Sequence, residues 1–155
     1  MKRLATFLSL AIIISLVSSF SYAAEDIKRT ATIVEMQGKA QVKSQSGEWI
    51  GAEIGMVLSE GAVIKTEEGS TALVYLEGGD EAASVEVKEK SELKLAQLFT
   101  TAKEGSNKTL LDLALGEILI TSKKLRSEKS KFEVKTPTSI VGVRGTTFSV
   151  SVETE

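Results

Sequence analysis

The sequence predicts an all-β fold, a twisted solenoid-like or sandwich arrangement of about ten short strands. Short apolar runs with a period of two residues follow one another from Ala31 onward. Clusters of glycine and polar residues, such as residues 44–48 and 77–81, separate these runs. Aromatic residues make up only 5% of the chain. The core must therefore consist of thin aliphatic layers, which suit a solenoid or a sandwich better than a ligand-holding barrel.

The first 23 residues resemble a signal peptide. Lys2 and Arg3 are followed by an uncharged stretch that reaches Phe20, and small residues lead to Ala23. The alternative is an uncleaved membrane anchor, because an uncharged segment of this length can span a bilayer. Its several serines favour cleavage after Ala23 instead.

Cleavage there predicts export to the periplasm or secretion, with no stable membrane anchor left in the mature chain. The mature chain would consist of a short N-terminal segment, residues 24–30, and one β domain, residues 31–155. It would hold 17 basic and 21 acidic residues, a net charge of −4. An acidic exported chain is not expected to bind nucleic acid.

The composition also limits the chemistry. The chain has no cysteine and no histidine. This excludes disulfides, a thiolate nucleophile, a Ser-His-Asp triad and a histidine-based zinc site. No glycine-rich phosphate loop is present. We therefore expect a non-enzymatic protein without a cofactor or a metal.

The strands follow from the apolar alternation. Residues 71–76 are apolar at both parities, which predicts a central strand covered on both faces. Residues 89–104 loosely fit a helical period, but Leu93 and Leu95 favour a strand. The expected strands are residues 31–36, 39–44, 62–66, 70–76, 84–87, 92–98, 109–115, 117–121, 131–136, 139–143 and 146–152.

A faint internal repeat connects two distant segments. The segment from Ile33 aligns with the segment from Leu111, which places Gly38 on Gly116. The spacing to the next similar motif differs between the two copies, so no fixed repeat length follows.

The last strands are interrupted in an unusual way. Pro137 removes a backbone donor, so the strand before it must end there or become an edge. Val143 and Phe148 lie on opposite parities, and such a switch needs an extra residue. We expect a bulge or tight corner at Arg144 and Gly145.

Two of these residues have alternative interpretations. Gly142 either lets another backbone approach closely or reduces bulk inside a thin core. Arg144 either binds a partner carboxylate or another anion, or pairs with an Asp or Glu of its own chain at the corner, and the second interpretation is favoured.

Two motifs resemble the FecR domain family. The segment "FEVKTPTSIVGVRGTTFSV", residues 132–150, is similar to the family's closing signature of a Thr-Pro corner and an Arg-Gly-Thr before Phe-x-Val. The segment "EWIGAEIGMVLSEGAVIKT", residues 48–66, resembles an upstream series of Trp, Gly, Leu, Gly, Ile and Thr. Glu77 and Ala62 stand where the family commonly has Asp. The resemblance covers roughly residues 33–152.

The resemblance implies an extracytoplasmic all-β domain, best known from transmembrane regulators that relay a siderophore signal to a sigma factor. Only 23 residues precede the predicted cleavage site, and few follow Val152. We therefore expect an exported stand-alone domain, without the sigma-binding domain or the domain that contacts the transporter.

The leading functional hypothesis is an interaction module of the cell envelope that binds a protein partner at a sheet edge near Pro137, with envelope signalling as a candidate role. Its candidate residues, with either a partner-binding or a structural role, are Thr136, Pro137, Gly142, Arg144, Gly145, Thr146 and Phe148.

The alternative is a glycan or cell-wall binding module, in which Trp49 stacks on a ligand. Trp49 could instead cover one end of the core. A third hypothesis is a polysaccharide-acting enzyme that uses Glu77 and Asp80. Glu77, Asp80 and Glu81 are close enough to bind calcium or to act as paired acids, but a solvated hairpin tip is the favoured interpretation. The basic residues of segment 123–131 either contact anionic lipids or form a solvated loop.

Overall fold

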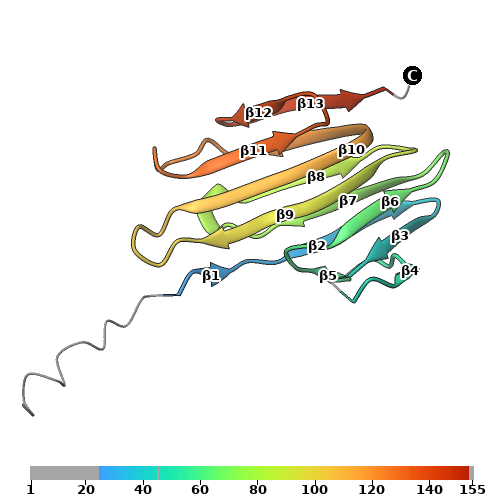
Figure 1. Ribbon diagram of the computed structural model, residues 1–155, viewed down its shortest axis with the longest axis horizontal. Helices are drawn as coiled ribbons and strands as arrows, with labels where there is room; N and C mark the ends of the chain where they lie inside the picture. The colour runs from blue at the N-terminus through green and yellow to red at the C-terminus, as the bar shows by residue number, and fades with distance from the viewer. Residues whose placement is uncertain (1–24, 45, 154–155) are drawn as a thin grey trace, which may run out of the picture.

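The computed structural model describes residues 25–44 and 46–153, so the predicted signal peptide and its cleavage after Ala23 lie outside the described residues. The described chain contains thirteen strands, a 3-10 turn and no α-helix, which confirms the all-β prediction (Figure 1). The strands are β1 (Ile27–Lys28), β2 (Ala31–Gln37), β3 (Ala40–Lys43), β4 (Trp49–Gly51), β5 (Val57–Leu58), β6 (Val63–Thr66), β7 (Thr71–Leu76), β8 (Ala83–Val87), β9 (Glu92–Thr100), β10 (Asn107–Ser122), β11 (Lys131–Lys135), β12 (Ile140–Val143) and β13 (Thr146–Val152).

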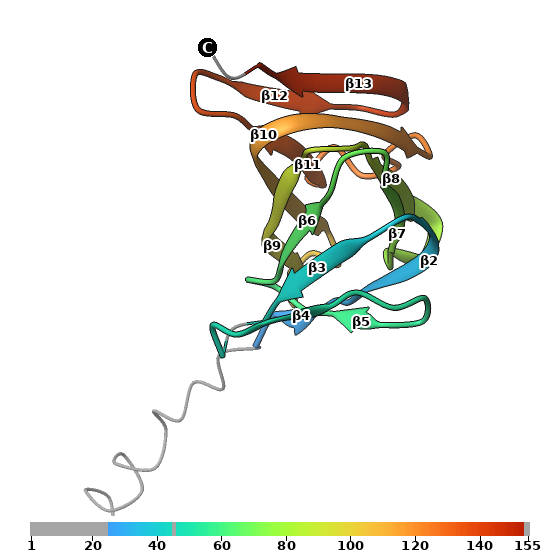
Figure 2. The same cartoon turned by 90° about the vertical axis from the view of Figure 1, so that its right-hand side faces the viewer.

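The strands form one curled sheet that folds into two layers (Figure 2). In the first layer, sheet A, the order is β4-β3-β6-β9-β10-β11-β12, and β1 also pairs with β9. In the second layer, sheet B, the order is β5-β2-β7-β8-β10-β13. All pairs are antiparallel except β10 with β11. Each layer therefore has β12 or β13 at one end and β4 or β5 at the other (Figure 1).

The long strand β10 belongs to both sheets. Its first half pairs with β9 and β11, and its second half pairs with β8 and β13. Gly116 lies between these halves with a φ of 86°, a conformation that glycine adopts readily. Prediction of two separate strands, residues 109–115 and 117–121, was therefore wrong, because the chain bends at Gly116 without leaving the extended ladder.

The weak internal repeat has a structural counterpart. Gly38 and Gly116 both have positive φ, and both lie where the chain passes between the sheets. The amide after each glycine donates to a serine hydroxyl at 2.9 Å, Lys39 to Ser70 and Glu117 to Ser91. A Cβ on either glycine would fall within 2.3 Å of that hydroxyl oxygen. The repeat therefore marks two glycine crossings in close contact with serines.

The core between the sheets is aliphatic, as predicted, and Phe132 is the aromatic residue among its buried members. β7 lies centrally between β2 and β8. The prediction that it is covered on both faces was wrong, because Leu73 is only half-buried and Tyr75 is 43% exposed. Sheet B has core on one side and no further layer of described residues on the other.

Residues 92–100 are a strand, which confirms the preference for a strand over a helix there. Three short strands, β1, β4 and β5, were not predicted. Each has only two or three residues, too few for a period to appear, and each exists because it pairs with a longer neighbour. Among the described residues, no helix has the length and apolar character needed to cross a membrane.

Candidate functional site: an exposed sheet edge

The turn between β11 and β12 is closed by its own polar groups. The Thr136 amide donates to the Ser139 carbonyl at 2.8 Å, and the Ser139 amide donates to the Thr136 hydroxyl at 3.1 Å. Pro137 lies inside this turn, where a missing N–H costs no ladder bond. β11 accordingly ends at Lys135, which confirms that the strand stops before Pro137.

β12 is an edge strand with apolar exposed residues. Among the described residues it pairs only with β11. Ile140 is 65% exposed and Val141 is 37% exposed. In an antiparallel pair, every second residue is hydrogen-bonded to the neighbouring strand. Because the Thr136 amide bonds to the Ser139 carbonyl, Val141 and Val143 are the residues of β12 that are hydrogen-bonded to β11. The amides of Ile140 and Gly142 therefore point to the free edge.

Gly142 itself has open surroundings. A Cβ built on Gly142 would meet no atom within 4 Å, and the residue is exposed. Both sequence-based interpretations were therefore wrong, since no backbone approaches Gly142 and it occupies no core position. Gly142 provides a backbone amide that points outward at the free edge of β12, where no side chain crowds it.

The corner at Arg144 and Gly145 is present. Val143 is buried in sheet A, and Phe148 packs against the core from sheet B, so the inward parity changes between them. Gly145 has a φ of 99°, and a Cβ there would come within 2.6 Å of the Lys124 Cα. The corner thus carries the chain from one sheet to the other while packing against the segment that follows β10.

Arg144 is exposed and makes no ion pair or hydrogen bond with any described residue. No described Asp or Glu forms the pair that the favoured interpretation expects at this corner. The close contact of Gly145 with Lys124 also brings Lys123 and Lys124 near the corner. The corner is positively charged and has no described carboxylate bound to it.

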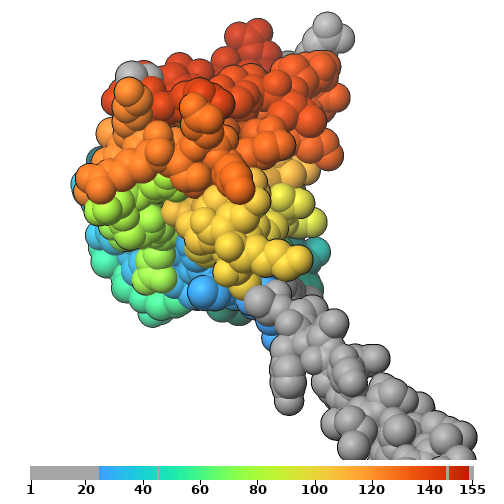
Figure 3. All heavy atoms as spheres, turned by 90° about the vertical axis from the view of Figure 1, so that its left-hand side faces the viewer, coloured from blue at the N-terminus to red at the C-terminus, as the bar shows by residue number. Residues whose placement is uncertain are grey.

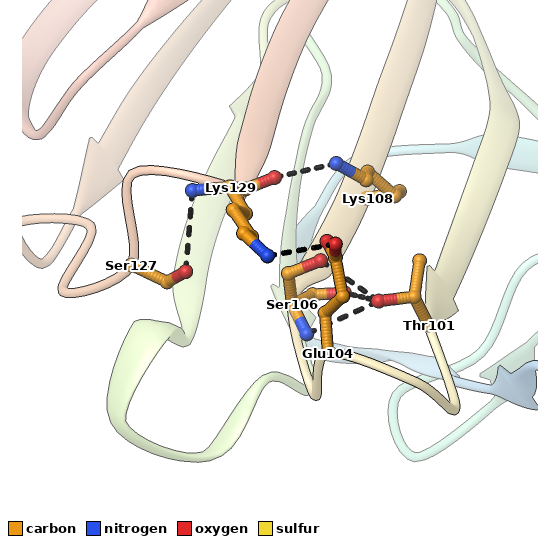
Figure 4. A network of polar contacts seen from close by, with 6 residues as sticks. All are labelled: Thr101, Glu104, Ser106, Lys108, Ser127 and Lys129. Atoms are coloured by element: carbon orange, nitrogen blue, oxygen red, sulfur yellow. Dashed lines mark hydrogen bonds and ion pairs between the residues drawn. The ribbon is translucent and has the colours of Figure 1, made fainter.

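Two other residues of the basic segment, Arg126 and Lys129, are held by their own chain. Arg126 pairs with Asp80 at 2.8 Å, and Lys129 pairs with Glu104 at 2.8 Å. Figure 4 shows Lys129 reaching Glu104, while the Lys108 ammonium donates to the Lys129 carbonyl. The bond to Lys129 holds the pKa of Glu104 below its ordinary value. This loop (orange) lies against the turns that hold Asp80 (green) and Glu104 (yellow) at one end of the molecule (Figure 3).

The three acids of the 77–81 turn do not converge on a common point. Glu77 accepts from the Thr30 hydroxyl at 2.6 Å, and Asp80 is held by Arg126. Glu81 accepts from the amides of Arg126 and Ser127 at 2.8 and 3.0 Å. Burial raises the pKa of Glu81, but hydrogen bonds from Ser130, Ser127, Arg126 and Asn107 outweigh it, so the net pKa is lowered. Glu81 acts as a clamp between this hairpin and the loop after β10.

Sequence reasoning missed Arg29, which is 9% exposed beside this clamp. Its guanidinium donates to the carbonyls of Glu77 and Lys108 and to the Thr109 hydroxyl. Burial lowers the pKa of Arg29, and the charge of Glu81 partly offsets this. A hollow of about 700 Å³ lies alongside. Nothing in the sequence around residue 29 indicates a buried arginine, because its partners come from strands 48 to 80 residues away.

The remaining candidates lie apart from one another. Thr146 and Phe148 belong to β13, where Thr146 pairs with Ser122. Trp49 is on β4 at the opposite end of sheet A, 38% exposed, with the Lys43 ammonium 5.7 Å from its ring. The interpretation that Trp49 covers the core was wrong, because its ring faces outward beside Lys43.

A family model described as FecR protein matches residues 62–155. The chain belongs to the FecR family. The matched residues of this FecR domain include β12, the corner and β13, whereas β4 with Trp49 lies before them. The family is regulatory rather than catalytic, and FecR proteins are associated with the cell envelope. No curated protein and no solved structure matches the chain.

Proposed function

We propose that this FecR domain is a non-enzymatic, exported binding module of the cell envelope. It takes up an extended segment of a protein partner as an additional strand beside β12. The observation that carries the proposal is the free edge of β12, with the amides of Ile140 and Gly142 directed outward.

The chemistry of the edge supports this proposal. Natural edge strands are commonly protected by charges, bulges or proline within the strand. β12 has the sequence Ile-Val-Gly-Val, and its protecting residues, Pro137 and Arg144, flank the strand instead. A partner strand would gain backbone bonds along four residues and apolar contact with Ile140 and Val141.

Arg144 supplies a means of setting the register. It follows β12 directly and is free of any described carboxylate. A carboxylate on the incoming strand would pair with it only in one alignment, and a slip of one residue would also turn the partner's side chains to the other face. A charged contact of this kind adds specificity more than affinity.

β12 is a better candidate than the other end of sheet A. β4 is also an edge, but it has three residues and lies outside the residues that match the family. A surface shared by the family is expected within the matched part, where β12 lies.

The test uses the outward amide of Gly142. Gly142→Pro removes this donor without removing a bond to β11, and Gly142→Ala is the matched control that keeps it. Immobilised domains are exposed to an envelope extract of the source cells, and thermal unfolding confirms that each variant is folded. We expect a protein retained by the wild type and by Gly142→Ala to be lost with Gly142→Pro. Arg144→Ala should weaken its binding roughly tenfold.

Retention of the same proteins by folded Gly142→Pro would show that no strand is added at β12. Unchanged affinity in Arg144→Ala would remove Arg144 from the site while leaving strand addition intact.

A further inference from the structure

The two sheets carry opposite charges on their outer faces. The outward positions in the strands of sheet A hold seven basic and three acidic side chains, although the whole chain has a net charge of −2. Among the described side chains at the outward positions in the strands of sheet B, three are glutamates and none is basic. The residues of sheet A are Lys28, Lys43, Lys65, Lys94, Lys108, Lys131 and Lys135 with Glu92, Asp112 and Glu133; those of sheet B are Glu35, Glu86 and Glu117.

The lysines of sheet A lie in register across the strands. Lys135 is opposite Asp112, Asp112 is opposite Lys94, and each step moves one strand along the sheet. The same row continues from Lys94 through β6 to Lys43, and then to Trp49. Neighbouring strands are about 4.8 Å apart, so the three lysines recur about every 10 Å. The result is a line of evenly spaced positive charges that ends at an aromatic ring.

Few of these charges are neutralised by the protein. Among the described residues, Lys135 with Asp112, at 3.6 Å, is the one ion pair that involves any of the seven lysines. Lys43 lies over the Trp49 ring instead of beside a carboxylate. A second row crosses the sheet in the same direction, with Lys131, Lys108, the half-buried Phe99 and Lys28 in register.

We propose that the outer face of sheet A binds a linear glycan that carries carboxylates, such as a polyuronate, with its chain lying across the strands. The regular lysines pair with carboxylates that recur along the glycan chain, and Trp49 packs against the apolar face of a sugar ring. This proposal is independent of strand addition at β12, because it uses outward side chains and leaves the β12 backbone free.

The residue types favour this occupant over a nucleic acid or a lipid surface. Every basic residue in the strands of sheet A is a lysine, whereas phosphate recognition favours the forked guanidinium of arginine. Insertion into a lipid surface requires a gathered apolar face, but Val63 and Trp49 alternate with charged residues along the row. Evenly spaced charges match a polymer with evenly spaced carboxylates.

Trp49 is the single tryptophan of the chain, so its fluorescence reports on this face directly. The test titrates the protein with polygalacturonate and with the fully methyl-esterified polymer, which lacks the charge. We expect a saturable change in Trp49 emission with polygalacturonate, weakened as salt is added, and no saturable change with the ester.

Matched variants locate the site. Replacing Lys43, Lys94 and Lys135 together by Glu should weaken polygalacturonate binding at least about tenfold. The control replaces Lys39, Lys103 and Lys123, exposed lysines outside the strands, with the same change in net charge. Trp49→Ala should also weaken binding. Because this variant has no tryptophan, its binding is measured by calorimetry.

Equal losses in the two triple variants would mean that binding depends on net charge, and they would overturn the proposal. Binding of polyphosphate or anionic phosphatidylglycerol vesicles as tight as that of polygalacturonate would also overturn it, because the face would then be a general cation surface. No fluorescence change with polygalacturonate at low salt would have the same consequence.

Discussion

Gly145 is the residue on which the corner depends. Its φ of 99° is unfavourable for any L side chain, and a Cβ would lie 2.6 Å from the Lys124 Cα, a backbone atom that cannot move aside alone. This combination explains why the chain has a glycine directly after Arg144. The sequence predicted the corner because apolar parity changes there, and parity is a property of neighbouring residues.

Gly145→Ala should lower the free energy of unfolding by about 2–4 kcal/mol, through the positive φ and the backbone contact. Gly142→Ala is the control three residues before the corner and should stay within about 0.5 kcal/mol of wild type, because its Cβ enters open space. Urea unfolding of the two variants measures the difference. Equal effects would mean that the corner is not set by Gly145.

Glu81 is the residue whose protonation should be visible in stability. Its folded-state pKa is lowered, so its contribution is present above its unfolded pKa and is lost as pH falls through the folded value. Glu81→Gln should therefore cost about 1 kcal/mol at pH 7, because it weakens the bonds from the Arg126 and Ser127 amides.

The difference in the free energy of unfolding between wild type and Glu81→Gln should become smaller below about pH 4.5, the ordinary pKa of a glutamate. Asp80→Asn, which alters the neighbouring exposed pair with Arg126, serves as the control and should change stability little. A gap that stays constant down to pH 3 would show that Glu81 is not a charged clamp.

At the scale of elements, the bend at Gly116 is the feature that lets one strand, β10, belong to both layers. Strands with a clear period of two were predicted with bounds close to those observed, such as β2, β9 and β13. The sequence predicts two strands in place of β10, because a glycine inside an apolar run can mark either the end of a strand or a bend within it. The shortest strands have no pattern of their own and arise from pairing.

Gly116→Ala should destabilise the domain more than Gly105→Ala. Both glycines have positive φ, but a Cβ at Gly116 would lie 2.1 Å from the Ser91 hydroxyl oxygen, whereas Gly105 has nothing within 4 Å. We expect losses of about 3 kcal/mol and about 1 kcal/mol, measured by urea unfolding. A Gly116→Ala, Ser91→Ala double variant should recover part of the difference. Equal losses at both glycines would show that the serine contact does not constrain the crossing.

At the scale of the whole molecule, function depends on what the sheets leave uncovered. The sequence indicates the basic segment 123–131 as a candidate charged surface, but Arg126 and Lys129 in that segment form ion pairs within the chain. The lysines of sheet A are scattered along the chain from Lys28 to Lys135, and only the register of six strands brings them to one face. Strand register depends on long-range pairing, so the charged face was not predictable from local pattern.

The free edge of β12 was predictable in part. Pro137 indicated a strand end, and the Arg-Gly corner indicated that the next strand departs. Which strand remains unpaired depends on the parallel pairing of β11 with β10, which no local signal reveals. The outward direction of the Gly142 amide follows only from the hydrogen bond that closes the turn at Thr136.

The most direct test of strand addition at β12 is photo-crosslinking in intact source cells. A photoreactive residue at Ile140 is compared with the same residue at Ile54, which is 62% exposed and lies between β4 and β5, the strands at the opposite ends of the two sheets. The account predicts a protein adduct from position 140 that disappears when Gly142→Pro is added and is absent from position 54. An adduct from position 140 that persists in folded Gly142→Pro, or the same adduct from both positions, would contradict it.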